Sequence, residues 1–299
     1  MNEIDRLLDI GFINDAFLSA EERCGFSISH AIKKVWAVQL YLLREFIDVC
    51  KEHNLVYWAY GGTLLGAVRH KGYIPWDDDI DVAMPREDYD LLCAHPEWFK
   101  RPAALHIPSN SERYYEGWLR LHDVCTAVLY ENYKKEGSVQ GIYIDIFPID
   151  NYRDTFSEKR KIKRIWRTNI IGHAYVYNAN KHFIARLLSR VSRTLHCFNC
   201  ERAFKKINNL AKSKEQSKEV MMKVGHFYST EKQIFNKDDY GGFEEMPFEF
   251  LTINVPSGWD NILRKNYGDY LKYPPVEKRG CWHSFIFEVD APFSSFIKN

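Results

Sequence analysis

Residues 57–84 read "YWAYGGTLLGAVRHKGYIPWDDDIDVAM", and this stretch decides the fold. The β-branched and aromatic run at 55–60 predicts a buried strand that ends at a glycine pair, and residues 63–71 predict a short helix. Residues 79–84 predict a second strand. A strand, a helix and another strand in so short a stretch indicate a mixed sheet covered by helices.

The aspartates in "WDDDID" are crowded between a tryptophan and an apolar strand. Asp79 and Asp81 are two residues apart in a strand and so project from the same face, with Asp77 at the strand's entrance. Their repulsion would raise their pKa values unless a cation lay between them. Mg²⁺ or Mn²⁺ prefers such oxygen ligands. We expect a metal site here, with Asp78 pointing away and dispensable; a solvated acidic loop is the alternative.

The glycine pair extends the metal hypothesis toward a phosphate site. Gly61 and Gly62 follow a predicted strand and precede a helix, where small residues let the backbone approach a ligand and free N–H groups face it. Thr63 would add a hydroxyl group. Taken alone, a Gly-Gly pair more often marks a simple turn. One helix before paired carboxylates, it indicates nucleotide phosphates held over a metal ion.

A third carboxylate and several cations complete the candidate site. Asp145 lies between two isoleucines in "YIDIFPID", where an unpaired charge would be costly, and it is expected to act as a metal ligand or as a base. Arg69, Lys71 and Arg120 are candidates for binding phosphate. A plain surface charge is the alternative for each of these three.

Outward from this stretch, helix and strand patterns alternate as far as residue 150. Residues 30–52 carry apolar residues at three- and four-residue intervals, which is typical of an amphipathic helix. A second helix is expected at 85–95. Further strands are expected at 117–123, 126–132, 141–150 and 248–256, and a helix at 258–268. The expected fold class is α+β (mixed α/β), with a catalytic core at 1–150 and a mostly helical, basic region at 151–299.

Three stretches of the chain resemble the LicD family, the phosphocholine transferases related to fukutin. They are "YWAYGGTLLGAVRHKGYIPWDDDIDVAMPREDYD", "GIYIDIFPID" and the C-terminal "YGDYLKYPPVEKRGCWH". The resemblance implies a nucleotidyltransferase-like fold, Asp77, Asp79, Asp81 and Asp145 as the site of Mg²⁺, and a basic C-terminal segment that returns to the active site. The basic residues of that segment are Lys278, Arg279 and His283.

The resemblance also implies an activity. Such proteins transfer a phospho-alcohol, typically phosphocholine from CDP-choline, onto a sugar of a surface polysaccharide, lipopolysaccharide or teichoic acid, with release of CMP. Three alternatives stay open: a metal-dependent nucleotidyltransferase, a nucleotide-sugar glycosyltransferase, and a glycan-binding relative without catalysis. The donor screen that distinguishes them is described below.

Charge is distributed unevenly along the 299 residues, although the formal net charge is only +1. From 159 to 200 the chain has Lys and Arg but no acidic residue, and apolar residues recur there at helical spacing. This pattern fits peripheral contact with an anionic membrane or polymer, and equally a helix packed on the domain with a solvated basic face. Nucleic acid is not expected, because no nucleic-acid motif accompanies the stretch.

The start of the chain and its cysteines bear on location. The N-terminus "MNEIDRLLDIGF" is acidic where a signal peptide would be basic, and no apolar run has the length of a membrane span. Seven cysteines are scattered without a disulfide framework. We therefore expect a cytoplasmic protein, with the inner face of the plasma membrane as the place of any peripheral contact.

Overall fold

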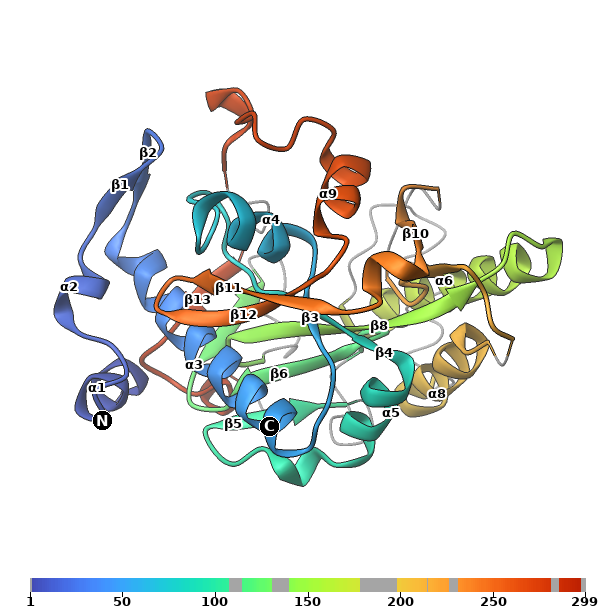
Figure 1. Ribbon diagram of the computed structural model, residues 1–299. Coiled ribbons are helices and arrows are strands. Elements are labelled where there is room, and N and C mark those ends of the chain that lie inside the picture. Colours follow the sequence, from blue (N-terminus) through green and yellow to red (C-terminus); the bar gives the residue numbers. More distant parts are fainter. Residues whose placement is uncertain are drawn as a thin grey trace.

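The structure is a computed structural model that describes residues 2–107, 115–130, 140–177, 198–213, 215–225, 231–280 and 285–296. Its main sheet is built on the long strand β8 (Tyr143–Tyr152), shown in Figure 1. Along one edge of β8 lies the parallel strand β4 (Asp81–Pro85), which is followed by the antiparallel strand β3 (Trp58–Ala59). These three strands carry most of the predicted site.

The opposite edge of β8 is shared by two strands in succession. β6 (Leu119–Asp123) pairs antiparallel with the first part of β8, and β9 (Glu219–Met221) pairs antiparallel with its last three residues. β5 (Ala103–His106) extends the sheet beyond β6, and β10 (Ile234–Asn236) extends it beyond β9. The sheet thus mixes one parallel pair with antiparallel pairs, and the predicted mixed α/β fold class is confirmed.

Helices cover the sheet where the apolar spacing predicted them. α3 (His30–Glu52) coincides with the predicted helix 30–52, and its N-terminus is capped by the Ser29 hydroxyl, which accepts the Ile32 N–H. α4 (Gly61–His70) follows β3 directly and contacts β4 and α9 (Trp259–Tyr267), as Figure 1 shows. α9 ends where Gly268 adopts a positive φ of 68°, which a glycine tolerates without strain.

The other elements surround this core. The helices are α1 (Glu3–Asp9), α2 (Asp15–Leu18), α5 (Arg86–Ala94), α6 (Phe156–Tyr177) and α8 (Cys200–Ala211), with short 3-10 turns at Pro96–Trp98, Glu231–Gln233, Lys237–Tyr240, Val276–Lys278 and Phe293–Phe296. Three two-stranded sheets pair β1 (Glu21–Arg23) with β2 (Phe26–Ile28), β11 (Phe243–Phe248) with β12 (Leu251–Pro256), and β7 (Ala127–Tyr130) with β13 (Phe285–Glu288).

Two strand predictions need correction. The strand expected at 79–84 begins only at Asp81, because Asp79 precedes the ladder with β8 and β3. The strand expected at 126–132 is β7, which pairs with β13 in a separate sheet instead of joining the main one. In both cases tertiary pairing decides where the ladder begins and which partner it takes, and residues 131–132 of the second prediction lie outside the described residues.

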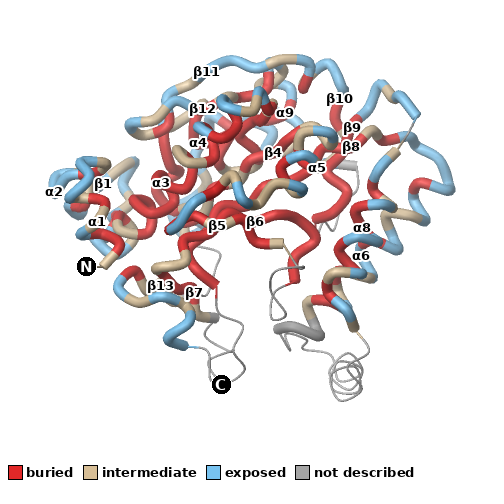
Figure 2. Tube along the Cα trace, turned by 90° about the horizontal axis from the view of Figure 1, so that it is seen from below, coloured by how far each residue is buried: buried red, intermediate tan, exposed pale blue. Residues whose placement is uncertain are grey.

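Most buried hydrophobic residues form one large cluster that includes both halves of the chain, and Tyr115, Cys200 and Ala203 form a small second one. Figure 2 shows the buried positions concentrated in α3, α4 and the strands β4, β6 and β8. Residues after 150, among them Ile165, Met222 and Ile253, belong to the same cluster. The expected boundary at residue 150 falls inside β8, and the region 151–299 contains five strands besides its helices in its described part.

The basic stretch is described only in part. α6 covers its first portion, and residues 178–197 lie outside the described residues. The buried positions of α6 include Ile165 and Asn169, whereas Phe156, Trp166 and Ile171 are exposed. None of the helices in the described part of the chain has both the length and the apolar character needed to cross a bilayer.

Candidate active site

The parallel ladder between β4 and β8 brings two of the predicted carboxylates together. Asp81 is in register with Asp145, and the Asp145 N–H donates to the carbonyl of Ile80 at 2.9 Å. Asp79 and Asp81 both line two cavities on this side of the sheet. The residues from Asp77 to Asp81 alternate between partly exposed and buried positions, so the prediction that Asp79 and Asp81 share one face agrees with their placement.

The backbone of the aspartate segment is fixed by side chains from distant elements. The Trp36 indole N–H donates to the Asp77 carbonyl at 3.1 Å, and the Gln39 amide donates to the Asp78 carbonyl at 2.8 Å. Thr63 Oγ1 accepts the Asp81 N–H at 2.8 Å. Thr63 is buried and orients Asp81, so its predicted role as a hydroxyl at a phosphate site is not what its contacts indicate.

The glycine pair faces the carboxylates closely. A Cβ on Gly62 would come within 2.6 Å of Asp77 Oδ2, and a Cβ on Gly61 would come within 3.1 Å of Asp81 Oδ2. Gly61 also has a positive φ of 53°, which side-chain-bearing residues rarely adopt. The two glycines are therefore needed to let the first turn of α4 lie against two acidic side chains.

Electrostatics at this point favour a bound cation. Burial, followed by the charge of Asp79, raises the pKa of Asp77 well above its usual value. Burial, followed by the charges of Asp79 and Asp145, raises the pKa of Asp81 in the same way. Both effects arise because carboxylates repel one another in a site with little solvent. A divalent cation between them would reverse both effects.

Asp78 is the most buried of the four aspartates, at 3% exposure. One of its carboxylate oxygens nevertheless lies within 4.8 Å of those of Asp77 and Asp79. It does not line either cavity, in keeping with the expectation that it points away from the ligand. Asp78 instead contributes its backbone carbonyl, which accepts a hydrogen bond from Gln39 and so fixes this segment.

Two side chains donate hydrogen bonds to Asp145: Trp118, just before β6, and Arg120 on β6. Trp118 Nε1 donates to Oδ1 at 2.7 Å, and Arg120 Nε donates to the same oxygen at 2.6 Å. Arg120 is buried and lies over the ring of Tyr143, 3.8 Å from its centroid. Burial raises the pKa of Asp145, and Arg120 opposes that rise. Arg120 therefore pairs with Asp145, and the prediction that it binds phosphate is replaced by this role.

Two cavities meet at the aspartates. The first, of about 630 Å³, is lined by Gly62, Leu65, Arg69, Ile74, Trp76, Asp77, Asp79, Asp81, Tyr267, Asp269, Tyr270, Lys272, Pro274 and Lys278. The second, of about 430 Å³, is lined by Tyr60, Gly61, Gly62, Asp79, Asp81, Trp118, Asp145, Phe147, Met222, Gly225, Lys232, Gln233, Asn266 and Tyr267. Sequence reasoning missed Trp118, Lys232, Tyr267 and Lys272 as lining residues. Tyr267 and Lys272 lie in the quoted C-terminal motif, whose Lys278, Arg279 and His283 were singled out instead.

Of the basic residues predicted to bind phosphate, some line a cavity and others do not. Arg69 and Lys278 line the first cavity, so the C-terminal segment does return to the site. Arg279 stacks over Trp76, 5.0 Å from its centroid, behind the cavity wall. Lys71 is exposed at the C-terminal cap of α4 and lies outside both cavity walls, in contrast to its predicted phosphate role. His283 lies outside the described residues.

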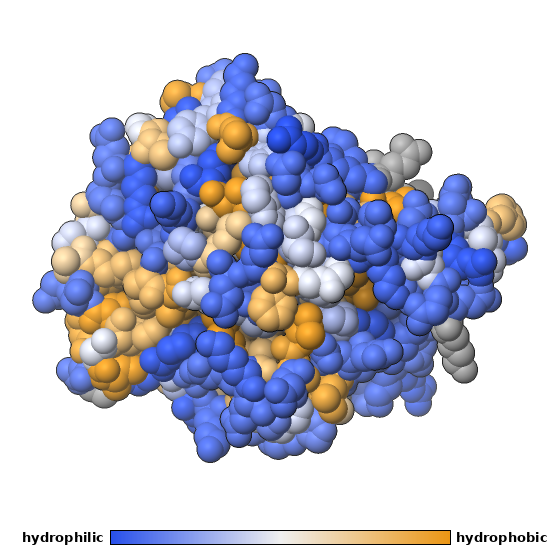
Figure 3. Space-filling view, viewed as in Figure 1, coloured by the Kyte–Doolittle hydropathy of each residue, from blue (hydrophilic) through white to orange (hydrophobic). Residues whose placement is uncertain are grey.

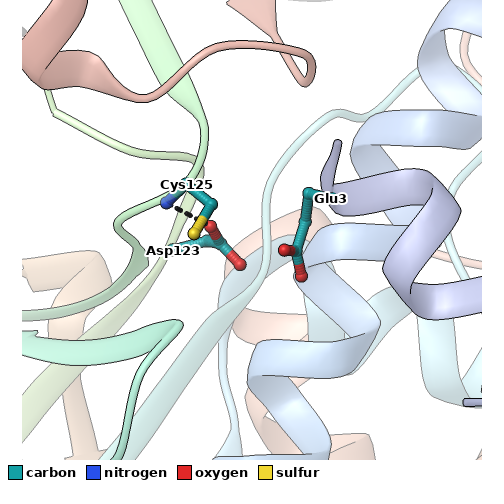
Figure 4. A group of neighbouring side chains, drawn as sticks. All are labelled: Glu3, Asp123 and Cys125. Carbon is teal, nitrogen blue, oxygen red and sulfur yellow. Dashed lines mark hydrogen bonds between the residues drawn. The ribbon is translucent and has the colours of Figure 1, made fainter. Parts of the chain in front are cut away.

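A second group of acidic residues lies away from this site, where α1 meets the end of β6 (Figure 4). Glu3 and Asp123 are buried, and the Cys125 N–H donates to Asp123 Oδ1 at 2.7 Å. Arg6 Nε donates to both oxygens of Glu3 and neutralises it. Burial, and then Glu3, raises the pKa of Asp123 to about 8. We interpret this group as two carboxyl groups that share a proton.

Sequence comparison places the main site within a known family. Residues 54–197 match the family model described as "LicD/FKTN/FKRP, nucleotidyltransferase domain". This segment contains Gly61 and Gly62, the aspartates at 77–81 and Asp145 of β8. Residues 54–197, just under half of the chain, therefore match the LicD family.

Three relatives differ in how much of the chain they share. The lipopolysaccharide cholinephosphotransferase LicD of Haemophilus influenzae is 28% identical over 269 residues, which cover 82% of this chain and 93% of the relative. The human ribitol 5-phosphate transferase FKRP is 44% identical over 45 residues, 15% of this chain and 9% of the relative. Mannosyltransferase regulator 4 of Saccharomyces cerevisiae is 26% identical over 132 residues, 40% of this chain and 11% of the relative.

Proposed function

We propose that this protein transfers a phospho-alcohol, most simply phosphocholine, from a CDP-alcohol to a hydroxyl group of a cell-surface glycan or glycolipid and releases CMP. The observation that carries the proposal is that two separate cavities meet at Asp79 and Asp81. A group-transfer enzyme needs two substrates on opposite sides of one reacting centre. The relatives named as cholinephosphotransferase and ribitol 5-phosphate transferase support the class of group transferred.

The residues at the junction fit a divalent metal, Mg²⁺ or Mn²⁺. Asp77, Asp79 and Asp81 offer hard oxygen ligands, whereas Asp145 is assigned the role of base. Gly61 and Gly62 leave room beside Asp81 and Asp77 that any Cβ would fill. When bound, the metal would neutralise diphosphate charge and stabilise the leaving phosphate. The same carboxylates without a cation would repel a diphosphate.

The chain's own residues perform the remaining steps. The acceptor hydroxyl attacks the phosphorus that carries the alcohol, an O–P bond forms, and the bond from that phosphorus to the bridging oxygen breaks, which releases CMP. The hydroxyl proton passes to the Asp145 carboxylate, whose raised pKa makes it a better base than an exposed aspartate. Trp118 and Arg120 hold this carboxylate in place, while Arg69 contributes positive charge in the first cavity.

The decisive experiment is a donor screen. The protein is incubated with Mg²⁺, a panel of CDP-alcohols and a panel of nucleotide-sugars, and CMP and other released nucleotides are followed by mass spectrometry. CMP from one or more CDP-alcohols, lost in Asp81→Asn, is the expected result. Release of a sugar nucleotide's nucleoside diphosphate instead would indicate a glycosyltransferase, and attachment of CMP to the acceptor a nucleotidyltransferase. Tight glycan binding without any turnover would indicate a binding protein.

We also propose that the protein works at the cytoplasmic face of an anionic membrane, where glycolipid acceptors are found. The exposed side of α6 carries Arg160, Lys163, Arg164 and Arg167, with exposed Phe156 at its beginning. Figure 3 shows mainly hydrophilic side chains over α6 with an apolar group at its free end. Each basic residue near an anionic bilayer contributes about 1 kcal/mol.

Co-sedimentation with vesicles tests this location. Binding to vesicles that contain phosphatidylglycerol is expected, with loss at high salt and in the triple variant Arg160→Glu, Lys163→Glu, Arg164→Glu. Vesicles of phosphatidylcholine alone serve as the control and should bind little. Equal binding of the triple variant and the natural chain would refute the membrane contact through α6 and leave the helix with a solvated basic face.

A further inference from the structure

The two cavities at the aspartates differ in chemistry, although they share a wall. Gly62, Asp79, Asp81 and Tyr267 line both of them. Tyr267, at the end of α9, therefore stands at the junction. The differences lie in the residues that each cavity does not share.

Apart from the aspartates of the metal site, the first cavity is lined by three basic side chains and one acidic one, Asp269, together with aromatic rings. Its unshared lining includes Arg69, Lys272 and Lys278 together with Trp76 and Tyr270. Arg69 is held in place, because Nη1 donates to the Tyr270 carbonyl at 2.6 Å. Positive side chains balance phosphate charge, and aromatic faces suit a nucleobase. This combination fits a nucleoside diphosphate.

Apart from its carboxylates, the second cavity has Lys232 as the one basic side chain among the described residues that line it. Its unshared polar groups are the amides of Gln233 and Asn266 and the carboxylate of Asp145. Tyr60 donates to Gln233 Oε1 at 2.7 Å, which orients that amide. Asn266 Oδ1 is buried and has no hydrogen-bond partner among the described residues. Amides, a carboxylate and the aromatic rings of Trp118 and Phe147 match the hydroxyl groups and apolar ring faces of a sugar.

The position of Asp145 supports the same division of the two cavities. Asp145, assigned above as the proton acceptor, lines the second cavity and not the first. The group that loses a proton in the reaction is the acceptor hydroxyl, so the acceptor must lie on the side of Asp145. The side of Arg69, Lys272 and Lys278 is then left for the donor, whose phosphates carry the negative charge.

We infer that the cavity of Arg69, Lys272 and Lys278 binds the nucleoside diphosphate of the donor, and that the cavity of Gln233, Asn266 and Asp145 binds the sugar of the acceptor. The inference rests on the proposed function, because it takes the reaction as given and assigns its two substrates to two sides. Tyr267 separates the two sides and contacts both.

Two matched double variants test the assignment. Lys272→Ala with Lys278→Ala removes charge from the first cavity, and Gln233→Ala with Asn266→Ala removes amides from the second. Affinity for CDP-choline and for CMP is measured by calorimetry on the full chain with Mg²⁺. We expect the lysine variant to weaken both ligands about tenfold or more, since charge-assisted contacts to phosphate are lost. The amide variant should stay within about twofold of the natural chain.

The outcomes separate the two claims. If the natural chain binds neither CDP-choline nor any other CDP-alcohol, the proposed function fails and the assignment with it. If the natural chain binds a CDP-alcohol, but the amide variant weakens it as much as or more than the lysine variant, only the assignment is overturned. Circular dichroism on both variants checks that each is folded, and Lys71→Ala serves as a control that removes a lysine outside both cavities.

Discussion

Arg120 and Asp145 stand opposite each other on adjacent antiparallel strands, with Arg120 Nε 2.6 Å from Asp145 Oδ1. Both are buried, at 5% and 8% exposure. Removing either member of such a buried ion pair is costly, because the remaining charge is left without water or a partner. Arg120 therefore keeps the Asp145 carboxylate ionised and oriented at the junction of the two cavities.

Removing Arg120 is expected to affect stability and activity separately. Arg120→Met should destabilise the fold by about 3–5 kcal/mol, because it leaves Asp145 buried and unpaired. Adding Asp145→Asn should recover part of that stability without recovering turnover. Urea unfolding and CMP release measure the two effects. If Arg120→Met alone unfolded at the same urea concentration as the natural chain, the ion pair would not have the structural role assigned to it.

Glu116 is expected to act as a positioning residue through Arg120. Its carboxylate lies 3.4 Å from Arg120 Nη1 and 2.7 Å from His173 Nε2 on α6. Glu116→Gln should lower kcat about tenfold, because the guanidinium that orients Asp145 loses a charged partner. The KM for the donor should stay unchanged, since neither residue lines the cavity of Arg69, Lys272 and Lys278. A raised KM with an unchanged kcat would contradict this role, and Glu116→Asp should retain more activity than the glutamine variant.

Gly62, in the first turn of α4, gives a steric test of the metal site. A methyl group at Gly62 would meet Asp77 Oδ2 at 2.6 Å, so Gly62→Ala must push this carboxylate away from its place. We expect activity at low Mg²⁺ to fall more than activity at saturating Mg²⁺, because the metal is bound less tightly. Gly280→Ala is the matched control, since a Cβ there meets no atom of the described residues within 4 Å. Equal Mg²⁺ dependence in the two variants would show that Asp77 is not a ligand.

The aspartates also predict how metal changes thermal stability. A ligand at free concentration L that binds only the folded state stabilises it by RT ln(1 + L/Kd), so Tm rises with the logarithm of the ligand concentration once that exceeds Kd. Mg²⁺ should therefore raise the Tm of the natural chain and have no such effect on Asp81→Asn. Without metal, Asp81→Asn should be the more stable protein, because one of the repelling charges near Asp79 and Asp145 is gone. Scans with EDTA and with Mg²⁺ measure both, and a lower Tm for Asp81→Asn in EDTA would speak against repulsion.

Whether a feature of this site can be predicted from the sequence depends on how far apart along the chain the interacting residues lie. The shared face of Asp79 and Asp81 follows from two-residue spacing, and Asp145 is conspicuous as a charge between isoleucines. The donors from Trp36 and Gln39 lie about 40 positions before their acceptors and carry no motif. Only packing of α3 on the sheet brings them there.

The roles of the cations show the same limit. Lys71 and Arg69 are two positions apart, yet one caps the exposed end of α4 and the other lines a cavity. The sequence around Arg120 does not indicate its partner, and only the register of β6 against β8 shows that it faces Asp145. Tyr267 joins the site because α9 packs on α4 from far along the chain. Local pattern thus identifies the carboxylates, and tertiary structure assigns the residues around them.

The shared proton between Asp123 and Glu3 gives the chain a stability that depends on pH. Asp123 has a pKa of about 8 in the folded chain, against about 3.9 for an unfolded aspartate. Over that interval the folded state holds a proton that the unfolded state has lost, so stability falls as pH rises from about 4 to about 8. Arg6 pairs with Glu3, so the proton resides on Asp123.

Asp123→Asn should remove this dependence. The amide keeps an oxygen to accept the Cys125 N–H and supplies a donor toward Glu3, in the place of the protonated carboxyl group. Near pH 5 the two should be similar, and at pH 8 to 9 the variant should be more stable than the natural chain by about 4 kcal/mol, because about three pH units separate pH 5 from the folded pKa. Urea unfolding across this pH range is the measurement. A constant difference at all pH values would mean that no proton is shared, and that Asp123 is instead ionised beside Arg6.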